Sequence, residues 1–403
     1  MAPNLYGTSA TLLLEASQGD VQEKSSKMEK LTMQKLTTPK AQNKPEYKMR
    51  IVWRNVLAFL YLHYGAISGI ILFATSTRSY TILFAPFYAF FGAFGVTAGA
   101  HRLWAHRSYK ANLPLRIFLM LCQTIAFQNH IYEWCRDHRV HHKFTDTNGD
   151  PHSSKRGFFF SHMGWLMVRK HPDVKIKGAT IDMSDLEKDG VVIWQRRLYV
   201  VLVPILCFIL PTWIPYHFWG ERLLNAWYTT LFRYTLSLHL TWLINSAAHT
   251  IGMKPFDKSI SPTDDWTTSV LSFGEGWHNY HHVFPYDYKA AELDSYSGNF
   301  TLAIIHLFAK IGWAYDLKTV PHSVVRKRAE RIGDGTWQLR NAHLYQNSEN
   351  HNEQHQEHHH EHDLEDAVWG WGDKDLTKEE MTGAKILNKS DFVKYYNVGL
   401  KNN

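Results

Sequence analysis

Two histidine clusters with the same spacing, H-x-x-H-H, occupy residues 138–142 and 278–282. In a helix, residues three and four positions apart lie on one face, so each cluster directs three imidazole rings to one place. A single cluster would be weak evidence, because a histidine is more often a surface or satisfied core residue than a metal ligand. Two copies of the spacing predict a shared metal site.

Two further pairs of residues strengthen this prediction. His101 and His106 follow one apolar segment, and Asn245 and His249 follow another. Asn245 and His249 share a helix face, whereas His101 and His106 diverge by about 140° on an ideal helix and could serve two metals or lie across a helix end. Nine histidines exceed the needs of one tetrahedral zinc ion and suffice for two metal ions. The candidate ligands are His101, His106, His138, His141, His142, Asn245, His249, His278, His281 and His282.

The ligand type alone does not identify the metal, because imidazole binds iron, zinc, copper and nickel. Zinc hydrolases commonly use three protein ligands and a water molecule, which is fewer than this sequence offers. Soluble di-iron proteins rely on paired Glu-x-x-His motifs, whereas the repeated motifs here consist of histidines. An all-nitrogen di-iron centre at a membrane surface would suit the activation of oxygen against an unreactive carbon–hydrogen bond in a lipid.

Apolar segments must position these histidines. Four of them, at about 51–74, 80–100, 199–219 and 224–244, have the length of roughly 20 residues that a membrane span requires. Short turns join the first to the second and the third to the fourth, which predicts two hairpins. Arg233, near the middle of the fourth span, must face protein or a polar cavity. The apolar piece at 113–127 is too short to span and is expected to form an interfacial or partly buried helix.

Charge and topology agree on the orientation of these spans. Two hairpins put residues 1–50, 101–198 and 245–403 on one side, together with every histidine group and nearly all lysines and arginines. The positive-inside rule places that side in the cytosol. The net charge of +7 fits a charged cytosolic face, and a mean hydropathy of -0.32 is too polar for a transporter-like bundle. The predicted fold is therefore an all-α membrane protein, with four transmembrane helices in two hairpins and a cytosolic helical cap that carries a histidine-ligated di-metal site.

The chain divides into three predicted regions. Residues 1–48 are polar and expected to be a disordered cytosolic N-terminus. Residues 49–320 hold the membrane spans and the cytosolic cap, and residues 321–403 are expected to form a polar cytosolic tail. The histidine-rich tract at 351–362 is interpreted as a flexible segment that binds metal adventitiously. Three cysteines without paired spacing are interpreted as reduced and structural.

In order, spacing and flanking residues, the histidine motifs closely resemble those of the membrane acyl-CoA desaturases of the stearoyl-CoA desaturase type. The resemblance covers about residues 50–315 and includes the run from His101 to His106, the run from Asn245 to His249 and the flanking residues 274–277. The Trp-Gly-Trp stretch at 369–371 and the histidine-rich tail are similar to those of insect members.

The resemblance implies an activity and its cofactors. Family members insert a cis double bond, of the Δ9 or Δ11 type, into a saturated fatty acyl-CoA. They use O2 and two electrons from cytochrome b5 and its reductase, at a centre of two iron ions (Fe2+) held by nine histidines, with an asparagine that acts through water. These roles fall on the candidate ligands above. The resemblance also implies a multi-pass protein of the endoplasmic reticulum membrane with both termini in the cytosol, and no nucleic-acid partner is expected.

The resemblance further implies a set of substrate contacts. The residues that would contact the CoA portion and the upper acyl chain are Asn55, Asn129, Arg136, Asp137, Arg169, Lys170 and Trp242. The residues around the bend of the tunnel would be Gln128, Trp134 and Thr241. The cationic members of this set make physical sense as phosphate partners, although solvated surface residues would look the same in the sequence.

Three other functions compete with desaturation. A membrane lipid hydroxylase would share the metal site and differ in its product, while the box spacing favours a desaturase. A membrane zinc hydrolase would differ in its metal and would not depend on oxygen. A metal-handling membrane protein would place ligands along a transmembrane path, whereas these ligands cluster at helix ends on one side.

Overall fold

The computed structural model describes residues 47–293, 295–341 and 367–392. The chain separates into two units, Met1–Lys48 and Met49–Asn403, and the elements below all belong to the second. The predicted disorder of residues 1–48 falls almost wholly outside the described residues, and the histidine-rich tract at 351–362 falls entirely outside them.

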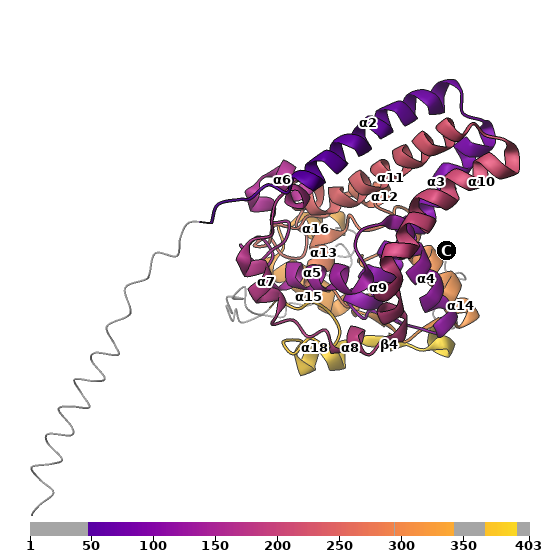
Figure 1. Ribbon diagram of the computed structural model, residues 1–403. Helices are drawn as coiled ribbons and strands as arrows, with labels where there is room; N and C mark the ends of the chain where they lie inside the picture. Colours follow the sequence, from indigo (N-terminus) through magenta and orange to yellow (C-terminus); the bar gives the residue numbers. More distant parts are fainter. Residues whose placement is uncertain (1–46, 294, 342–366, 393–403) are drawn as a thin grey trace, which may run out of the picture. The chain divides into compact units, whose positions relative to one another are not determined.

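Long helices form the apolar part of the structure. They are α2 (Trp53–Thr75), α3 (Ser79–Phe94) with its π-helical continuation η1 (Gly95–Ala105), the run α9 (Gly190–Val203), η4 (Pro204–Ile209) and α10 (Leu210–Trp219), and α11 (Leu223–Ser246). Helices α2 and α11 lie side by side (Figure 1). Gly69 permits this approach, because a Cβ there would lie 2.3 Å from the carbonyl oxygen of Tyr228.

Three of these helical runs are long and apolar enough to cross a membrane, within the described part of the chain: Trp53–Thr75, Ser79–Ala105 and Gly190–Trp219. The third begins earlier than the predicted residue 199, because the Asp189 side chain caps the helix by accepting hydrogen bonds from Val191 and Val192. The predicted fourth span forms the 24-residue helix α11 but is not among the three. Its sequence is interrupted by polar residues, and Arg233 is buried against protein, as expected.

The π-helix η1 places His101 and His106 differently from the ideal α-helix on which the sequence analysis relied. In this segment the amide of His106 donates to the carbonyl of His101, five residues earlier, over 3.1 Å. Hydrogen bonds of that span bring residues five apart onto one face, where an ideal α-helix would separate them. The two rings lie 4.7 Å apart and join one group, which favours their binding a single metal ion.

Helix α4 (Leu113–Ala126) is the short apolar helix that the sequence predicted. The Asn112 side chain caps it by accepting from the amide of Leu115, and the helix ends at Phe127 in the left-handed conformation. It packs against α3 and η1. Gly95 is required at this crossing, because a Cβ there would lie 2.1 Å from the backbone nitrogen of Gln123.

Shorter helices build the cap around α5 (Ile131–Lys143). They are η2 (Ser154–Arg156), α6 (Phe158–His162), η3 (Gly164–Met167), α7 (Pro172–Gly178), α8 (Ser184–Glu187), η5 (Ala247–His249), α12 (Trp266–Leu271), α13 (His278–Val283), α14 (Phe300–Ile311), α15 (His322–Ile332), α16 (Thr336–Arg340) and α18 (Lys378–Gly383). The three cysteines are buried and unpaired, as expected. The largest core cluster joins residues of η1, α4, α5, α9 and α14.

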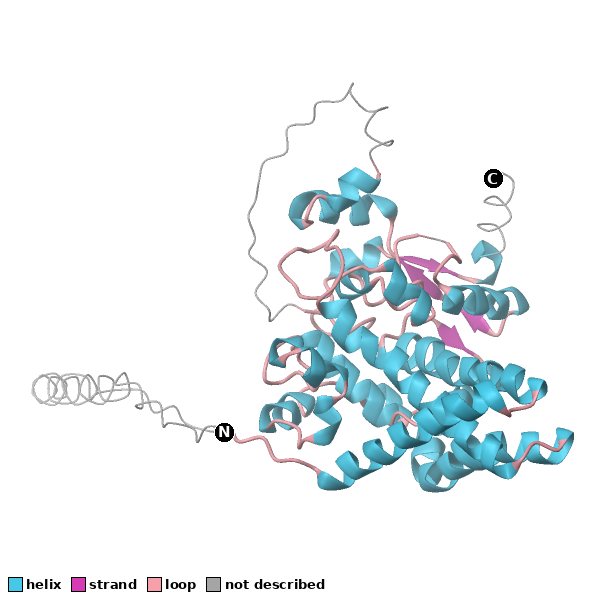
Figure 2. Ribbon diagram, turned by 90° about the horizontal axis from the view of Figure 1, so that it is seen from above, coloured by secondary structure: helices cyan, strands magenta, loops and turns pink. Residues whose placement is uncertain are grey.

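Two small antiparallel sheets lie among the cap helices (Figure 2). Strand β1 (Lys110–Ala111) pairs with β2 (Ala314–Tyr315), and β3 (Leu317–Thr319) pairs with β4 (Lys385–Leu387), with Lys318 opposite Ile386. Strand β4 belongs to the C-terminal segment, which also contributes buried Leu376 and Phe392 to the core. Nothing in the sequence pattern indicated that residues 367–392 pack so closely on the cap.

Candidate metal centre

The first group of ligand atoms comes from η1, α5 and α13, elements far apart in the sequence. Its five imidazoles offer nitrogens that all lie within 4.8 Å of one another, and they belong to His101, His106, His138, His142 and His281. The Nε2 atoms of His101 and His281 are 2.9 Å apart, as are those of His106 and His138. Helix α5 supplies two of the rings because residues four apart share its face.

The second group comes from α5, η5 and α13. It contains His141, His249, His278 and His282, again within 4.8 Å of one another. The ring of His282 stacks on that of His142 at 4.1 Å, so the two groups are neighbours. The structure therefore brings all nine predicted histidines together, five in one group and four in the other.

Acceptors behind the rings fix the orientation of several imidazoles. His101 Nδ1 lies 2.8 Å from a carboxylate oxygen of Glu275, and His141 Nδ1 lies 3.0 Å from one of Asp150. His106 Nδ1 donates to the carbonyl of Trp369. Because a carbonyl and a carboxylate only accept, the proton of each of these rings sits on Nδ1 and the lone pair of Nε2 faces the cluster. This is the usual arrangement of metal-ligating histidines.

Burial keeps seven of the clustered histidines neutral. It lowers the pKa of six of them well below the usual value, and the neighbouring imidazoles lower it further: His106, His138, His142, His278, His281 and His282. Burial and His141 lower the pKa of His249 to about 3. A metal ligand must be deprotonated, so these rings are already in the binding state at neutral pH.

The carboxylates behind the rings carry charge. Burial raises the pKa of the Glu275 carboxyl, but the Arg102 guanidinium and His101 outweigh it and hold that pKa below its usual range. Burial also raises the pKa of Asp150, and His141 and His152 outweigh it in the same way. Two negative charges behind the histidines therefore favour cations in front of them.

Metal ions fit this arrangement. The buried Nε2 atoms of His141 and His249 have no hydrogen-bond partner among the described residues, although both face the second group. A buried nitrogen without a partner is costly unless something binds it. Two groups of converging imidazoles, backed by acceptors, are suited to hold transition-metal ions.

A cavity of about 380 Å³ reaches the metal centre at His138, and its wall also includes His152, whose ring lies 4.4 Å from that of His141. Its wall includes seven of the predicted substrate contacts and the candidate ligand Asn245; the seven are Asn55, Gln128, Asn129, Trp134, Asp137, Thr241 and Trp242. Gln128 donates to the hydroxyl of Thr241 over 3.0 Å. The other wall residues, such as Phe59 and Leu62, are largely apolar.

Three predicted contacts do not line this cavity. Arg136 pairs with Asp137 at 3.0 Å, and Lys170 pairs with the other oxygen of the same carboxylate. Both cations therefore contact the cavity only through Asp137, which lines its wall. The backbone amide of Arg169 donates to the carbonyl of Arg50 over 2.9 Å, which places it at the junction with the segment before α2.

The sequence analysis missed the groups that orient the histidines. Glu275 stands three residues before His278 but orients His101, far earlier in the chain, so its place beside the second cluster did not reveal this contact. Asp150 lies nine residues after His141 and becomes a neighbour only through the turns that follow α5. The carbonyl of Trp369 belongs to the backbone, so no residue type could have revealed it.

Comparison with known proteins gives consistent matches. The family model described as fatty acid desaturase matches residues 77–292. The acyl-CoA Delta-9 desaturase of Acheta domesticus is 52% identical over 96% of this chain and 98% of its own length. The acyl-CoA Delta-12 desaturase of Tribolium castaneum is 46% identical over 88% and 97%, and the stearoyl-CoA desaturase of Homo sapiens is 52% identical over 75% and 84%.

Proposed function

The chain belongs to the fatty acid desaturase family, and from this premise we propose that it inserts a cis double bond into a saturated fatty acyl-CoA. One observation supports this most strongly: a cavity lined by apolar side chains and by seven of the predicted substrate contacts reaches the first of the two adjacent histidine groups at His138. A cavity of this kind suits a hydrocarbon chain, and the histidines suit an oxidising metal centre.

The proposed cofactor is a pair of iron ions, one for each group of histidines. The ligands would be the nine histidines, with Asn245 acting through water from the wall of the cavity. When bound, the iron ions would supply the oxygen activation that removal of two hydrogens from an alkyl chain requires. The role of the protein is to hold neutral imidazoles in place and to keep the acyl chain beside them.

Positioning decides which carbons react, because the methylenes of an acyl chain are chemically alike. The ring of Trp134 stacks on His138 at 4.8 Å, so this wall of the cavity lies directly beside the first group. The hydrogen bond between Gln128 and Thr241 joins α11 to the residues after α4 and would hold the bend of the tunnel. Arg136, Arg169 and Lys170 would bind the phosphates of CoA near Asp137.

The double-bond position is proposed as Δ9 or Δ11. Relatives of similar identity bear different names: Delta-9 in Acheta domesticus at 52%, and Delta(11) in Spodoptera littoralis at 49%. Overall sequence identity therefore does not determine the position of the double bond, and we propose that the shape of the cavity determines it.

The proposal extends to the partners and the location. Cytochrome b5 and its reductase would supply the electrons at the cytosolic side of the endoplasmic reticulum membrane. Helix α11 would be the fourth span, since it packs along the candidate span α2 and buries its polar side chains against protein. Both termini and the cap would then lie in the cytosol, in keeping with the positive-inside rule.

Product analysis tests the proposed reaction. The chain and its His141→Ala variant would be expressed in cells that lack their own desaturase, and mass spectrometry with derivatisation would locate new double bonds. We expect a new monounsaturated acid that disappears in the variant. Hydroxylated acids would favour the hydroxylase instead, and unchanged lipids at good expression would contradict the enzyme assignment.

A further inference from the structure

The C-terminal segment contacts one histidine of the first group through its backbone. The carbonyl of Trp369 accepts the Nδ1 proton of His106, and the amide of Trp371 donates to the carbonyl of His106 over 2.9 Å. His106 is thus held from its ring and from its backbone by residues more than 260 positions later in the chain.

Several side chains fasten this segment to the metal centre. Trp369 is buried, and the guanidinium of Arg139 lies 3.9 Å from the centre of its ring. Arg139 belongs to the first H-x-x-H-H cluster. Asp373 accepts from the amide of Trp369 over 2.9 Å and pairs at 3.1 Å with Lys143, the residue after His142. The segment is therefore tied to one face of helix α5, since Arg139 and Lys143 are four residues apart.

Only glycine fits at position 370. Its φ of +151° is one that other residues rarely adopt, and a Cβ there would lie 2.6 Å from the carbonyl oxygen of His106 and 2.7 Å from its Cα. The backbone at Gly370 therefore packs directly against the backbone of His106. Any side chain at this position must move the segment away from the histidine.

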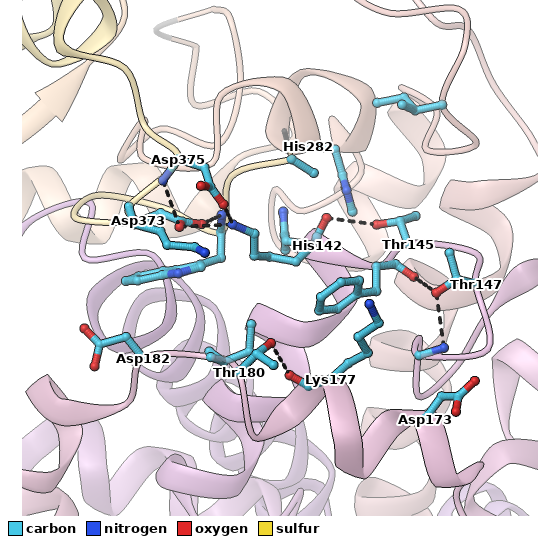
Figure 3. Close-up of a pocket in the computed structure, with 18 of the residues that line it drawn as sticks. His142, Thr145, Thr147, Asp173, Lys177, Thr180, Asp182, His282, Asp373 and Asp375 are labelled. Atoms are coloured by element: carbon cyan, nitrogen blue, oxygen red, sulfur yellow. Dashed lines mark hydrogen bonds and ion pairs between the residues drawn. The ribbon is translucent and has the colours of Figure 1, made fainter. Parts of the chain in front are cut away.

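The same segment borders a second cavity, of about 870 Å³, which reaches His142 and His282 (Figure 3). Asp373 and Asp375 lie at its edge and approach the same lysine, Lys143. The substrate cavity reaches the centre at a different residue, His138. The C-terminal segment thus lines a cavity that reaches the metal centre.

We propose that the carbonyl of Trp369 is a positioning group for the first group of histidines, and that it sets the metal affinity of that group. It fixes the proton of His106 on Nδ1, so Nε2 is held in the unprotonated state beside His138. A neutral imidazole can otherwise carry its proton on either nitrogen, and the wrong tautomer cannot bind through Nε2. This inference rests on the proposed function, and it assigns a role to a segment beyond the matched residues 77–292.

The decisive comparison is Gly370→Ala against Gly383→Ala. Both change one glycine of the C-terminal segment, but a Cβ at Gly383 meets nothing within 4 Å. The full-length proteins would be loaded with 57Fe, and iron binding would be measured by titration and by Mössbauer spectroscopy. We expect Gly370→Ala to bind one iron ion about 10–100-fold more weakly than the wild type, with a changed signal for that ion only, as for other losses of an orienting group.

Other results would overturn the inference. Gly370→Ala with two unchanged iron signals would do so, as would an equal loss of both ions, which a purely structural defect would cause. If Gly370→Ala does not fold, Asp373→Asn replaces it, since this change weakens the anchor to Lys143 and should affect the same ion. A wild-type protein that binds fewer than two iron ions would contradict the proposed function instead.

Discussion

Each imidazole of the metal centre has two nitrogens in different surroundings. One faces the cluster, and in the rings of His101, His106 and His141 the other meets a carboxylate or a carbonyl. These acceptors make the rings better ligands and hold them in one tautomer. The histidine spacing could be recognised in the sequence because it is a local pattern, whereas Asp150 and Trp369 depend on contacts made by the folded chain.

At this scale we predict that Asp150→Asn weakens metal binding at the second group. The amide cannot match the charge of the carboxylate behind His141. Both oxygens of Asp150 accept hydrogen bonds, one from His141 and the other from the amide of Asp146, so the NH2 end of the asparagine would face a donor in either orientation. We expect a loss of about 10–100-fold in metal affinity, measured by titration of the metal-free protein. Asp182→Asn changes an exposed carboxylate and should have no effect. Equal affinities in the two variants would refute the orienting role of Asp150.

At the scale of elements, the departure of η1 from α-helical geometry matters most. A sequence pattern based on 3.6 residues per turn separates His101 from His106, and the observed i→i+5 hydrogen bond reunites them. Such a segment gives no simple signal in the sequence. Helix α11 is the reverse case. The sequence predicted that this helix exists, but its buried polar face makes its composition more polar than that of the other long helices.

The crossing of η1 over α4 leads to a prediction about Gly95. In Gly95→Ala the new Cβ would collide with backbone atoms of Cys122 and Gln123, which cannot move without displacing α4. We expect a marked fall in the melting temperature together with loss of bound metal. Gly190→Ala is the matched control, because its Cβ has open space and should stabilise the helix by about 0.4–1 kcal/mol. If Gly95→Ala were as stable as the control, Gly95 would not be in close contact with the backbone of α4.

Strand β3 carries a lysine whose titration can be tested. Burial, reinforced by the charge of Lys110, lowers the pKa of Lys318 to about 8 from the ordinary value of 10.5. Between these two values the unfolded chain binds more protons than the folded one, so the stability of the folded protein rises with pH in that interval. Lys318→Met should lack this rise.

The measurement is the melting temperature of Lys318→Met and of the wild type from pH 7 to pH 10. We expect the difference between them to shift in favour of the wild type as the pH rises, because the cost of the buried charge disappears only in the wild type. Lys385→Met, in the adjacent strand β4, changes an exposed lysine and controls for general alkaline effects. A constant difference across this range would mean that Lys318 titrates normally.

At the scale of the whole molecule, the metal centre joins parts of the chain that are far apart in the sequence. Its histidines come from η1, α5, η5 and α13, and residues of the C-terminal segment contact two of these elements. The three helices long and apolar enough to cross a membrane and the histidine motifs could be predicted, because both are local patterns in the sequence. The packing of residues 367–392 on the cap could not, because it rests on single contacts such as Gly370 against His106.

This arrangement couples metal binding to stability. Removal of the metal by a chelator should lower the melting temperature, since a ligand that binds only the folded state stabilises it by about 2.7 kcal/mol at a hundredfold excess over its Kd. Addition of Fe2+ should restore the original value. Identical melting curves before and after chelation would mean that the histidine groups do not bind metal strongly enough to stabilise the fold.

The most direct test of the account is anomalous X-ray scattering from crystals of the purified protein, recorded at the iron and zinc absorption edges. We predict two iron peaks in each molecule, one among the five histidines of the first group and one among the four of the second. A single peak, or peaks that appear only at the zinc edge, would contradict the proposed di-iron centre and favour a hydrolytic or metal-handling protein.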